Sequence, residues 1–252
     1  MKLIAELCQN HNGDINTLKD MVVKSAESGA DIVKIQSIKA NSLTKRDEFE
    51  LFRKYSDEYK RLTSLELSID DELEFIHTAK ANNVTPMTTI FNLSRIEFTK
   101  NAGFEVVKLS SFDCSAHFMI KEILKRNFKT IVISTGATFD EEIEETCKIM
   151  KAHEDFHLLH CVSIYPTRLE VAHLNRINYL KSLTKNVGIS DHSDPEKQEV
   201  YWNATEKAVY FYGDVGLNSR IWETTSTTAA YDTLQGLTAA MNVTVTGHSG
   251  AN

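Results

Sequence analysis

The stretch LIAELCQNHNGD, residues 3–14, indicates most clearly how this chain folds. An apolar run with the length of a buried strand leads into a cluster of amides, an imidazole and the carboxylate of Glu6. In α/β barrels, active sites are built at the carboxyl ends of the strands. Asn-Gly-Asp is also ordinary turn and helix-cap chemistry, so this segment alone supports a catalytic and a purely structural interpretation equally.

Short apolar runs alternate with helical patterns along most of the chain. The seven apolar runs cover residues 3–7, 31–36, 84–90, 106–110, 130–134, 157–162 and 187–190. Two intervening patterns, at 94–97 and 138–141, fit the capping box of a helix start. Seven such units at intervals of roughly 25 to 30 residues predict an α/β fold, a TIM (β/α)8 barrel whose eighth unit is irregular or incomplete. No glycine-rich dinucleotide or Walker loop occurs, which disfavours a nucleotide-binding fold.

The composition excludes several classes of function. A formal net charge of −7 over 252 residues argues against a general nucleic-acid binder. No apolar run approaches the roughly 20 residues of a membrane span. The four cysteines lie far apart without paired metal spacing, and no signal peptide precedes the first strand. We therefore expect reduced thiols in a cytoplasmic protein.

Two regions depart from the alternation. Residues 40–67 form a long charged connection, which is either a functional loop or a solvated helical excursion. From residue 224 to residue 252, the only formally charged side chain is Asp232, and helical periodicity weakens. We expect a barrel domain over residues 1–223 and an atypical, low-charge tail over 224–252.

Two lysines stand among the polar side chains at the ends of the predicted strands. Lys34 and Lys108 both alternate with apolar neighbours, and a lysine inside a barrel is costly to bury without an anionic partner. Together with the hydroxyl groups at other strand ends, they predict a site for a phosphate or a carboxylate. Each lysine could instead reach solvent or pair with Glu6 or Asp113.

The seventh run ends in Ser190-Asp191-His192. A histidine beside a carboxylate serves as a metal ligand or a general base, although a lone loop histidine is more often a simple polar contact. The other histidines show no H-x-x-x-H or H-E-x-x-H spacing on one helix, so no hydrolytic zinc motif is present.

Six separated segments resemble the sialic acid synthases in order and spacing: AELCQNHNGD, SGADIVKIQS, VVKLSS, VISTGAT, LLHCVSIYPT and VGISDHSD. The resemblance to this N-acetylneuraminate synthase family, which also makes legionaminic, pseudaminic and related nonulosonic acids, spans residues 1–211. It implies a TIM-barrel transferase that condenses phosphoenolpyruvate with an N-acetylmannosamine-type sugar. The products would be a nine-carbon keto acid and phosphate, and a divalent ion, Mn²⁺ or Mg²⁺, would assist.

The resemblance also implies roles for the residues at the matching positions. Glu6 would act near the sugar aldehyde in proton transfer, and His192 would be a metal ligand. Gln36, Asp113 and Tyr165 would contact the sugar. The residues that would hold phosphoenolpyruvate are Lys34, Thr89, Lys108, Ser111, Ser134, Ser163 and Ser190.

The sequence departs from the family after the seventh run. Where the family's last strand supplies a second metal-binding histidine, residues 213–223 have none, so a second protein ligand is not identifiable. The family's C-terminal antifreeze-like domain, which lends an arginine to the neighbouring subunit, has no counterpart, and homodimer formation is left open. We expect weak activity at best. The alternatives are an aldolase-type barrel in which Lys108 forms a Schiff base, and an inactive phosphate-binding remnant.

Overall fold

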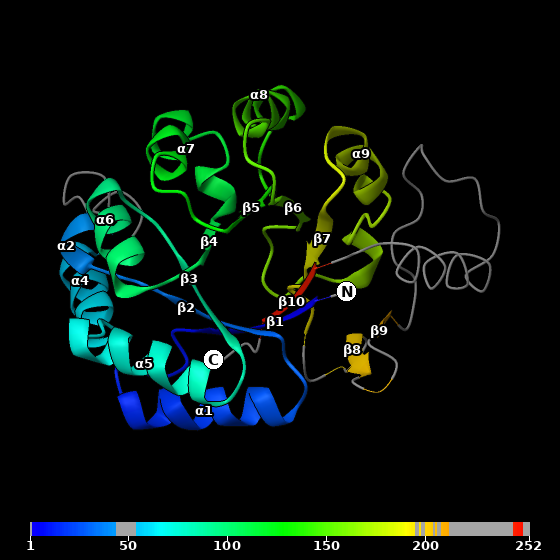
Figure 1. Cartoon of the computed structure of the whole chain (residues 1–252). Coiled ribbons are helices and arrows are strands. Elements are labelled where there is room, and N and C mark those ends of the chain that lie inside the picture. The colour runs from blue at the N-terminus through cyan, green and yellow to red at the C-terminus, as the bar shows by residue number, and fades with distance from the viewer. Residues whose placement is uncertain are drawn as a thin grey trace.

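A parallel sheet curls around the centre of the molecule (Figure 1). The computed structural model describes residues 2–43, 54–194, 197, 200–203, 205, 208–211 and 244–248. Its first seven strands pair in sequence order: β1 Lys2–Cys8, β2 Ile32–Gln36, β3 Thr85–Thr89, β4 Val106–Leu109, β5 Thr130–Ser134, β6 Phe156–His160 and β7 Val187–Ser190. Strand β10, Thr244–His248, pairs in parallel with both β1 and β7. The chain therefore has an α/β barrel-like fold.

Helices cover the outside of the sheet between successive strands (Figure 1). They are α1 Ile15–Glu27, α2 Ala40–Leu43, α4 Tyr55–Ser64, α5 Ile69–Ala81, α6 Leu93–Ala102, α7 His117–Leu124, α8 Asp140–Met150 and α9 Arg176–Leu183. Two short 3₁₀ helices, η1 Ser111–Asp113 and η2 Leu169–Val171, follow β4 and β6. No helix among the described residues has the length and apolarity that crossing a membrane requires.

All seven predicted strands are present, but both predicted helix starts are wrong by one or two residues. Helix α6 begins at Leu93, with Asn92 as its N-cap. Helix α8 begins at Asp140, and the Glu142 carboxylate accepts a hydrogen bond from the backbone N–H of Phe139 at 3.0 Å. The Thr138 hydroxyl donates instead to the carbonyl oxygen atoms of Ser111 and Gly136, so it does not cap the helix.

The two regions that interrupt the sequence pattern are only partly described. Within residues 40–67, helices α2 and α4 are present, which is the helical excursion that the sequence left open. The antiparallel pair β8 Val200–Asn203 and β9 Ala208–Phe211 was not predicted. Within the expected tail, β10 is described, and the rest of 224–252 lies outside the described residues, as does the 213–223 segment.

A layer of apolar side chains fills the inside of the curled sheet. Six buried residues from six successive strands pack together: Ile4, Ile32, Met87, Val106, Val132 and Leu159. Side chains alternate between the two faces of a strand, so the residue two positions further along each strand also points inward. Those next inward residues are Glu6, Lys34, Thr89, Lys108, Ser134 and Cys161. The strand period thus places a polar layer directly above an apolar one.

Candidate active site

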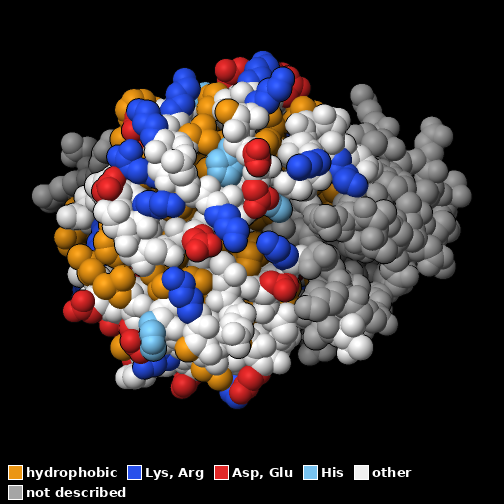
Figure 2. Space-filling model, in the orientation of Figure 1, with side chains coloured by type: hydrophobic (Ala, Val, Ile, Leu, Met, Phe, Trp, Pro, Cys, Tyr) orange, Lys and Arg blue, Asp and Glu red, His pale blue; other side chains and the backbone are white. Residues whose placement is uncertain are grey.

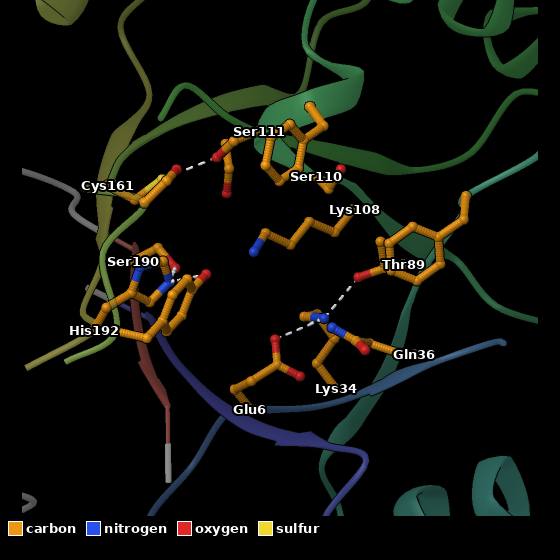
Figure 3. Close-up of a pocket in the computed structure, with 15 residues that line it drawn as sticks. Glu6, Lys34, Gln36, Thr89, Lys108, Ser110, Ser111, Cys161, Ser190 and His192 are labelled. Atoms are coloured by element: carbon orange, nitrogen blue, oxygen red, sulfur yellow. Dashed lines mark hydrogen bonds and ion pairs between the residues drawn. The ribbon is translucent and has the colours of Figure 1, made fainter. Parts of the chain in front are cut away.

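The polar layer lines a cavity of about 260 Å³ at the carboxyl ends of the strands (Figure 3). Except for Asp113, every residue that the sequence assigned to the site lies on its wall. The lining residues are Glu6, Lys34, Gln36, Thr89, Phe91, Lys108, Ser110, Ser111, Phe112, Ser134, Cys161, Ser163, Tyr165, Ser190 and His192. This edge is where α/β barrels place their active sites.

Glu6 and Lys34 form a buried ion pair at one wall of the cavity. Lys34 Nζ lies 2.6 Å from Glu6 Oε2 and donates a hydrogen bond of 2.7 Å to Thr89 Oγ1. The other Glu6 oxygen accepts from the backbone N–H of Cys8 at 3.0 Å, where β1 bulges away from β2. These contacts satisfy both charges, and removing either partner would leave the other buried and unpaired.

Lys108 is the second cation of the cavity and has a different environment. Its ammonium group makes no hydrogen bond or ion pair with any described residue, and Figure 3 shows it directed into the cavity. Burial, and then the positive charge of Lys34, lower the pKa of Lys108 to about 8. A bound anion would supply the missing partner, so this site is suited to a phosphate or a carboxylate.

Hydroxyl groups complete the anion-binding part of the wall. Ser134 Oγ is buried without a hydrogen-bond partner among the described residues. Ser111 Oγ accepts from the backbone N–H of Gly136 at 3.1 Å and lies 3.0 Å from Cys161 Sγ. A Cβ at residue 136 would lie 2.6 Å from both Cys161 Sγ and Ser163 Oγ. The glycine therefore allows the backbone to approach these side chains closely.

The imidazole of His192 has a defined orientation and tautomer. Its Nδ1 lies 2.7 Å from the carbonyl oxygen of Val162, which can only accept, so Nδ1 carries the proton. Nε2 then accepts, and the hydroxyl groups of Tyr165 and Ser190 lie 3.2 and 3.3 Å from it. Burial raises the pKa of Tyr165 to about 12, so its hydroxyl stays protonated and able to donate.

The family resemblance implies a divalent ion at this site. A histidine whose Nδ1–H is held by a backbone carbonyl is the usual form of a metal ligand. However, the described residues contain no group of three His, Cys, Asp or Glu side chains that could hold a metal. Glu6 is already paired with Lys34. The described residues therefore supply one suitable ligand and do not form a complete metal site.

Asp113 lies outside the cavity wall. It ends the short helix η1, and its carboxylate accepts a hydrogen bond of 2.5 Å from Ser110 Oγ. The sequence assignment also omitted four wall residues: Phe91, Ser110, Phe112 and Cys161. Cys161 follows the inward alternation of β6 and could have been identified from it, whereas Phe91 and Phe112 come from loops that carry no periodic signal.

Comparison with known proteins places the chain in a family. A model of the NeuB family matches residues 21–206. The chain is 34% identical over 76% of its length to the N,N'-diacetyllegionaminic acid synthase of Campylobacter jejuni serotype O:2, and 31% identical over 76% to a pseudaminic acid synthase of C. jejuni serotype O:23/36. It covers 60% and 58% of these two relatives.

A solved structure gives the same assignment. The N-acetylneuraminic acid synthetase of Leptospira borgpetersenii, in complex with citrate, matches with a TM-score of 0.67 and 27% identity. The match covers 76% of this chain and 65% of that one. The family model, the relatives and the solved structure agree: the chain belongs to the NeuB family of sialic acid synthase-like enzymes.

Proposed function

We propose that this chain carries the active site of a nonulosonic acid synthase, which condenses phosphoenolpyruvate with an N-acetylmannosamine-type sugar and releases phosphate. The observation that carries the proposal is the placement of Lys34 and Lys108 on one cavity wall together with the hydroxyls of Ser134 and Ser190. Phosphoenolpyruvate bears a phosphate and a carboxylate, and these cations and donors match both groups.

The chemistry needs no nucleophile from the protein. The methylene carbon of the enol phosphate attacks the sugar aldehyde carbon, and the aldehyde oxygen takes up a proton to become a hydroxyl. Water then adds to the phosphate-bearing carbon and gives up one proton. The hydroxyl so formed loses its remaining proton to the departing phosphate as the bond between that carbon and the phosphate oxygen breaks, which leaves the keto acid and phosphate. The protein's work is to hold the anion against the aldehyde and to move protons. Glu6, held by Lys34 at the cavity wall, is the carboxylate placed to accept the proton of the water.

We propose His192 as a ligand of Mn²⁺ or Mg²⁺. The remaining ligands would come from substrate oxygen atoms or from water. We also infer that β10 supplies the eighth strand of a (β/α)8 barrel, so that the barrel domain would comprise residues 1–223 together with this strand from the expected tail. Figure 2 shows charges of both signs interspersed on the visible face, which fits small-molecule partners better than nucleic acid or a membrane surface. We propose that the enzyme is cytoplasmic.

A second candidate is an aldolase-type reaction, and one observation favours it. With a pKa of about 8, Lys108 has a neutral amine fraction near neutral pH, as a Schiff-base lysine requires. Borohydride in the presence of pyruvate or a sugar aldehyde would trap such an adduct as a secondary amine. Mass spectrometry of the Lys108 peptide separates the two reactions, since the synthase reaction leaves no covalent adduct.

Phosphate release is the direct test of the proposed function. The chain would be incubated with phosphoenolpyruvate, Mn²⁺ and either N-acetylmannosamine or a diacetamido analogue, with Lys108→Met as the comparison. We expect phosphate release that requires the sugar and is lost in the variant. No release while phosphoenolpyruvate still binds would replace the synthase by the inactive phosphate-binding remnant. Release that is independent of the sugar would show hydrolysis of phosphoenolpyruvate and would overturn the synthase reaction.

A further inference from the structure

A series of hydrogen-bonded side chains, which we call the relay, connects helix α4 to the cavity wall. Its members are Glu58, Arg61, Gln9 and Gln36. The Glu58 carboxylate accepts two hydrogen bonds from Arg61, at 3.0 Å from Nε and 2.8 Å from Nη2. Arg61 Nη1 donates to Gln9 Oε1 at 3.2 Å. Gln9 Nε2 donates in turn to Gln36 Oε1 at 2.8 Å. The last member, Gln36, lines the cavity.

Arg61 sets the direction of every hydrogen bond in the relay. A guanidinium group donates and cannot accept, so the atom of Gln9 that faces Arg61 must be the amide oxygen. Gln9 then has only its NH₂ group to offer Gln36, and the Gln36 oxygen must accept. The NH₂ group of Gln36 is left, and it has no partner among the described residues. Figure 3 shows it directed into the cavity.

We propose that Arg61 is a positioning residue that acts through Gln9 to hold the Gln36 amide with its N–H donor toward the substrate. The Gln36 amide would thereby favour sugars that place an oxygen atom able to accept its hydrogen bond, such as that of an acyl carbonyl or a hydroxyl. This inference rests on the proposed function, because it assigns Gln36 to the sugar. It makes helix α4, which lies within the 40–67 connection, a source of selectivity for the sugar.

A second contact fixes where α4 lies. Gly13, in the turn that follows β1, has φ +79°, and a Cβ there would lie 2.3 Å from the carbonyl oxygen of Ser64, the last residue of α4. The turn therefore abuts the final turn of the helix, close to Arg61. The packing of this turn against α4 therefore places both Gln9 and Arg61. The direction of the hydrogen bonds between them is thus set by the fold.

Gln9→Glu gives the sharpest test. A carboxylate still accepts from Arg61 but cannot donate to Gln36, so the Gln36 amide must turn over and present its oxygen to the cavity. We expect the KM for the sugar to rise about tenfold or more, which corresponds to the loss of one hydrogen bond in a buried site. The KM for phosphoenolpyruvate should stay unchanged. Arg61→Ala and Gln9→Met, which release the amide without reversing it, should give smaller increases.

Arg126→Ala is the matched control, since Arg126 pairs with Glu97 on the surface at 2.7 Å and does not line the cavity. An unchanged sugar KM in Gln9→Glu would overturn the inference. An independent readout is the NMR signal of the Gln36 side-chain NH₂, identified by its loss in Gln36→Met. It should shift in Gln9→Glu and Arg61→Ala but not in Arg126→Ala. If the wild-type chain shows no sugar-dependent phosphate release, the proposed function fails, and the NMR signal still decides whether the relay exists.

Discussion

Glu6 and Lys34 occupy paired positions on β1 and β2, and their charged groups lie 2.6 Å apart in the cavity wall. The pair is internally neutral. Lys108, which has no ion-pair partner in the described part of the chain, therefore provides the net positive charge of the wall. The Glu6–Lys34 pair holds two functional groups in place, and Lys108 is the cation free to meet an incoming anion.

The ion pair predicts a non-additive loss of stability. Lys34→Met should leave the Glu6 carboxylate buried without its partner and lower the free energy of unfolding by about 3–5 kcal/mol. Adding Glu6→Gln should recover much of this loss, because no unpaired charge then remains. Urea unfolding of the two single variants and the double variant measures the coupling. Additive effects would mean that the two groups do not stabilise each other.

Lys108 predicts how anion binding depends on pH. Its pKa is lowered to about 8, so its charge is lost as the pH rises through that value. We expect the affinity for phosphoenolpyruvate to fall between about pH 7 and about pH 9, and binding near the pKa to take up a proton. Calorimetry in two buffers of different ionisation enthalpy measures both effects. Lys108→Met should bind more weakly and lose this pH dependence.

The same shift has a consequence for stability. The pKa of Lys108 is lower in the folded chain than in the unfolded chain, so the unfolded chain binds more protons between pH values of about 8 and about 10.5. The contribution of Lys108 to the free energy of unfolding should therefore increase as the pH rises across this window. Comparing urea unfolding of the wild type and Lys108→Met at both ends isolates the contribution. If the free energy of unfolding changes equally with pH in the wild type and in Lys108→Met, the change belongs to other groups.

Gly136→Ala should disturb the hydroxyl side of the cavity. The new methyl group would lie 2.6 Å from Cys161 Sγ and Ser163 Oγ, so these side chains must move. Overpacking of this kind typically costs about 1–3 kcal/mol, and the affinity for phosphoenolpyruvate should fall with it. Gly103→Ala is the matched comparison, because its nearest neighbour, Lys80 Nζ, is 3.7 Å away. That variant should lose stability through its positive φ alone and keep its affinity.

His192 predicts the response to manganese. His192→Ala removes the imidazole whose Nε2 faces the cavity, and Mn²⁺ binding measured by electron paramagnetic resonance should weaken. Tyr165→Phe removes only a hydroxyl that donates to Nε2 at 3.2 Å, so this variant should bind Mn²⁺ at least as well as the wild type. Equal Mn²⁺ affinity in His192→Ala and the wild type would place the ion elsewhere. Turnover comparable to an intact synthase would contradict the weak activity that we expect.

The strand period explains why most residues predicted for the site line one cavity. Glu6, Lys34 and Lys108 each stand two residues after an apolar inward residue, so a regular alternation placed them in one layer. Asp113 follows the end of β4 by several residues and lies in a 3₁₀ helix, where that alternation no longer applies. The residue types alone therefore could not show that its carboxylate faces Ser110.

A different reason explains why the sequence did not predict the relay to Gln36. Gln9 and Arg61 are 52 residues apart in sequence and meet because α4 packs against the turn at Gly13. The start of α8 was misplaced because the Thr138 hydroxyl donates to the carbonyl oxygen of Ser111, 27 residues away in the sequence. Contacts between distant segments decide such cases, and local propensity does not contain them.

The six apolar side chains beneath the polar layer also determine how ligands can come and go. They fill the inside of the sheet beneath the polar layer that contains Lys34, so we expect ligands to enter and leave at the opposite end of the cavity, where the exposed Tyr165 lies. In the proposed reaction, the substrate held by the lysines would lie deeper in the cavity than the substrate contacted near Tyr165. The proposed function therefore predicts ordered binding, in which the enol phosphate enters first and the sugar then blocks its exit.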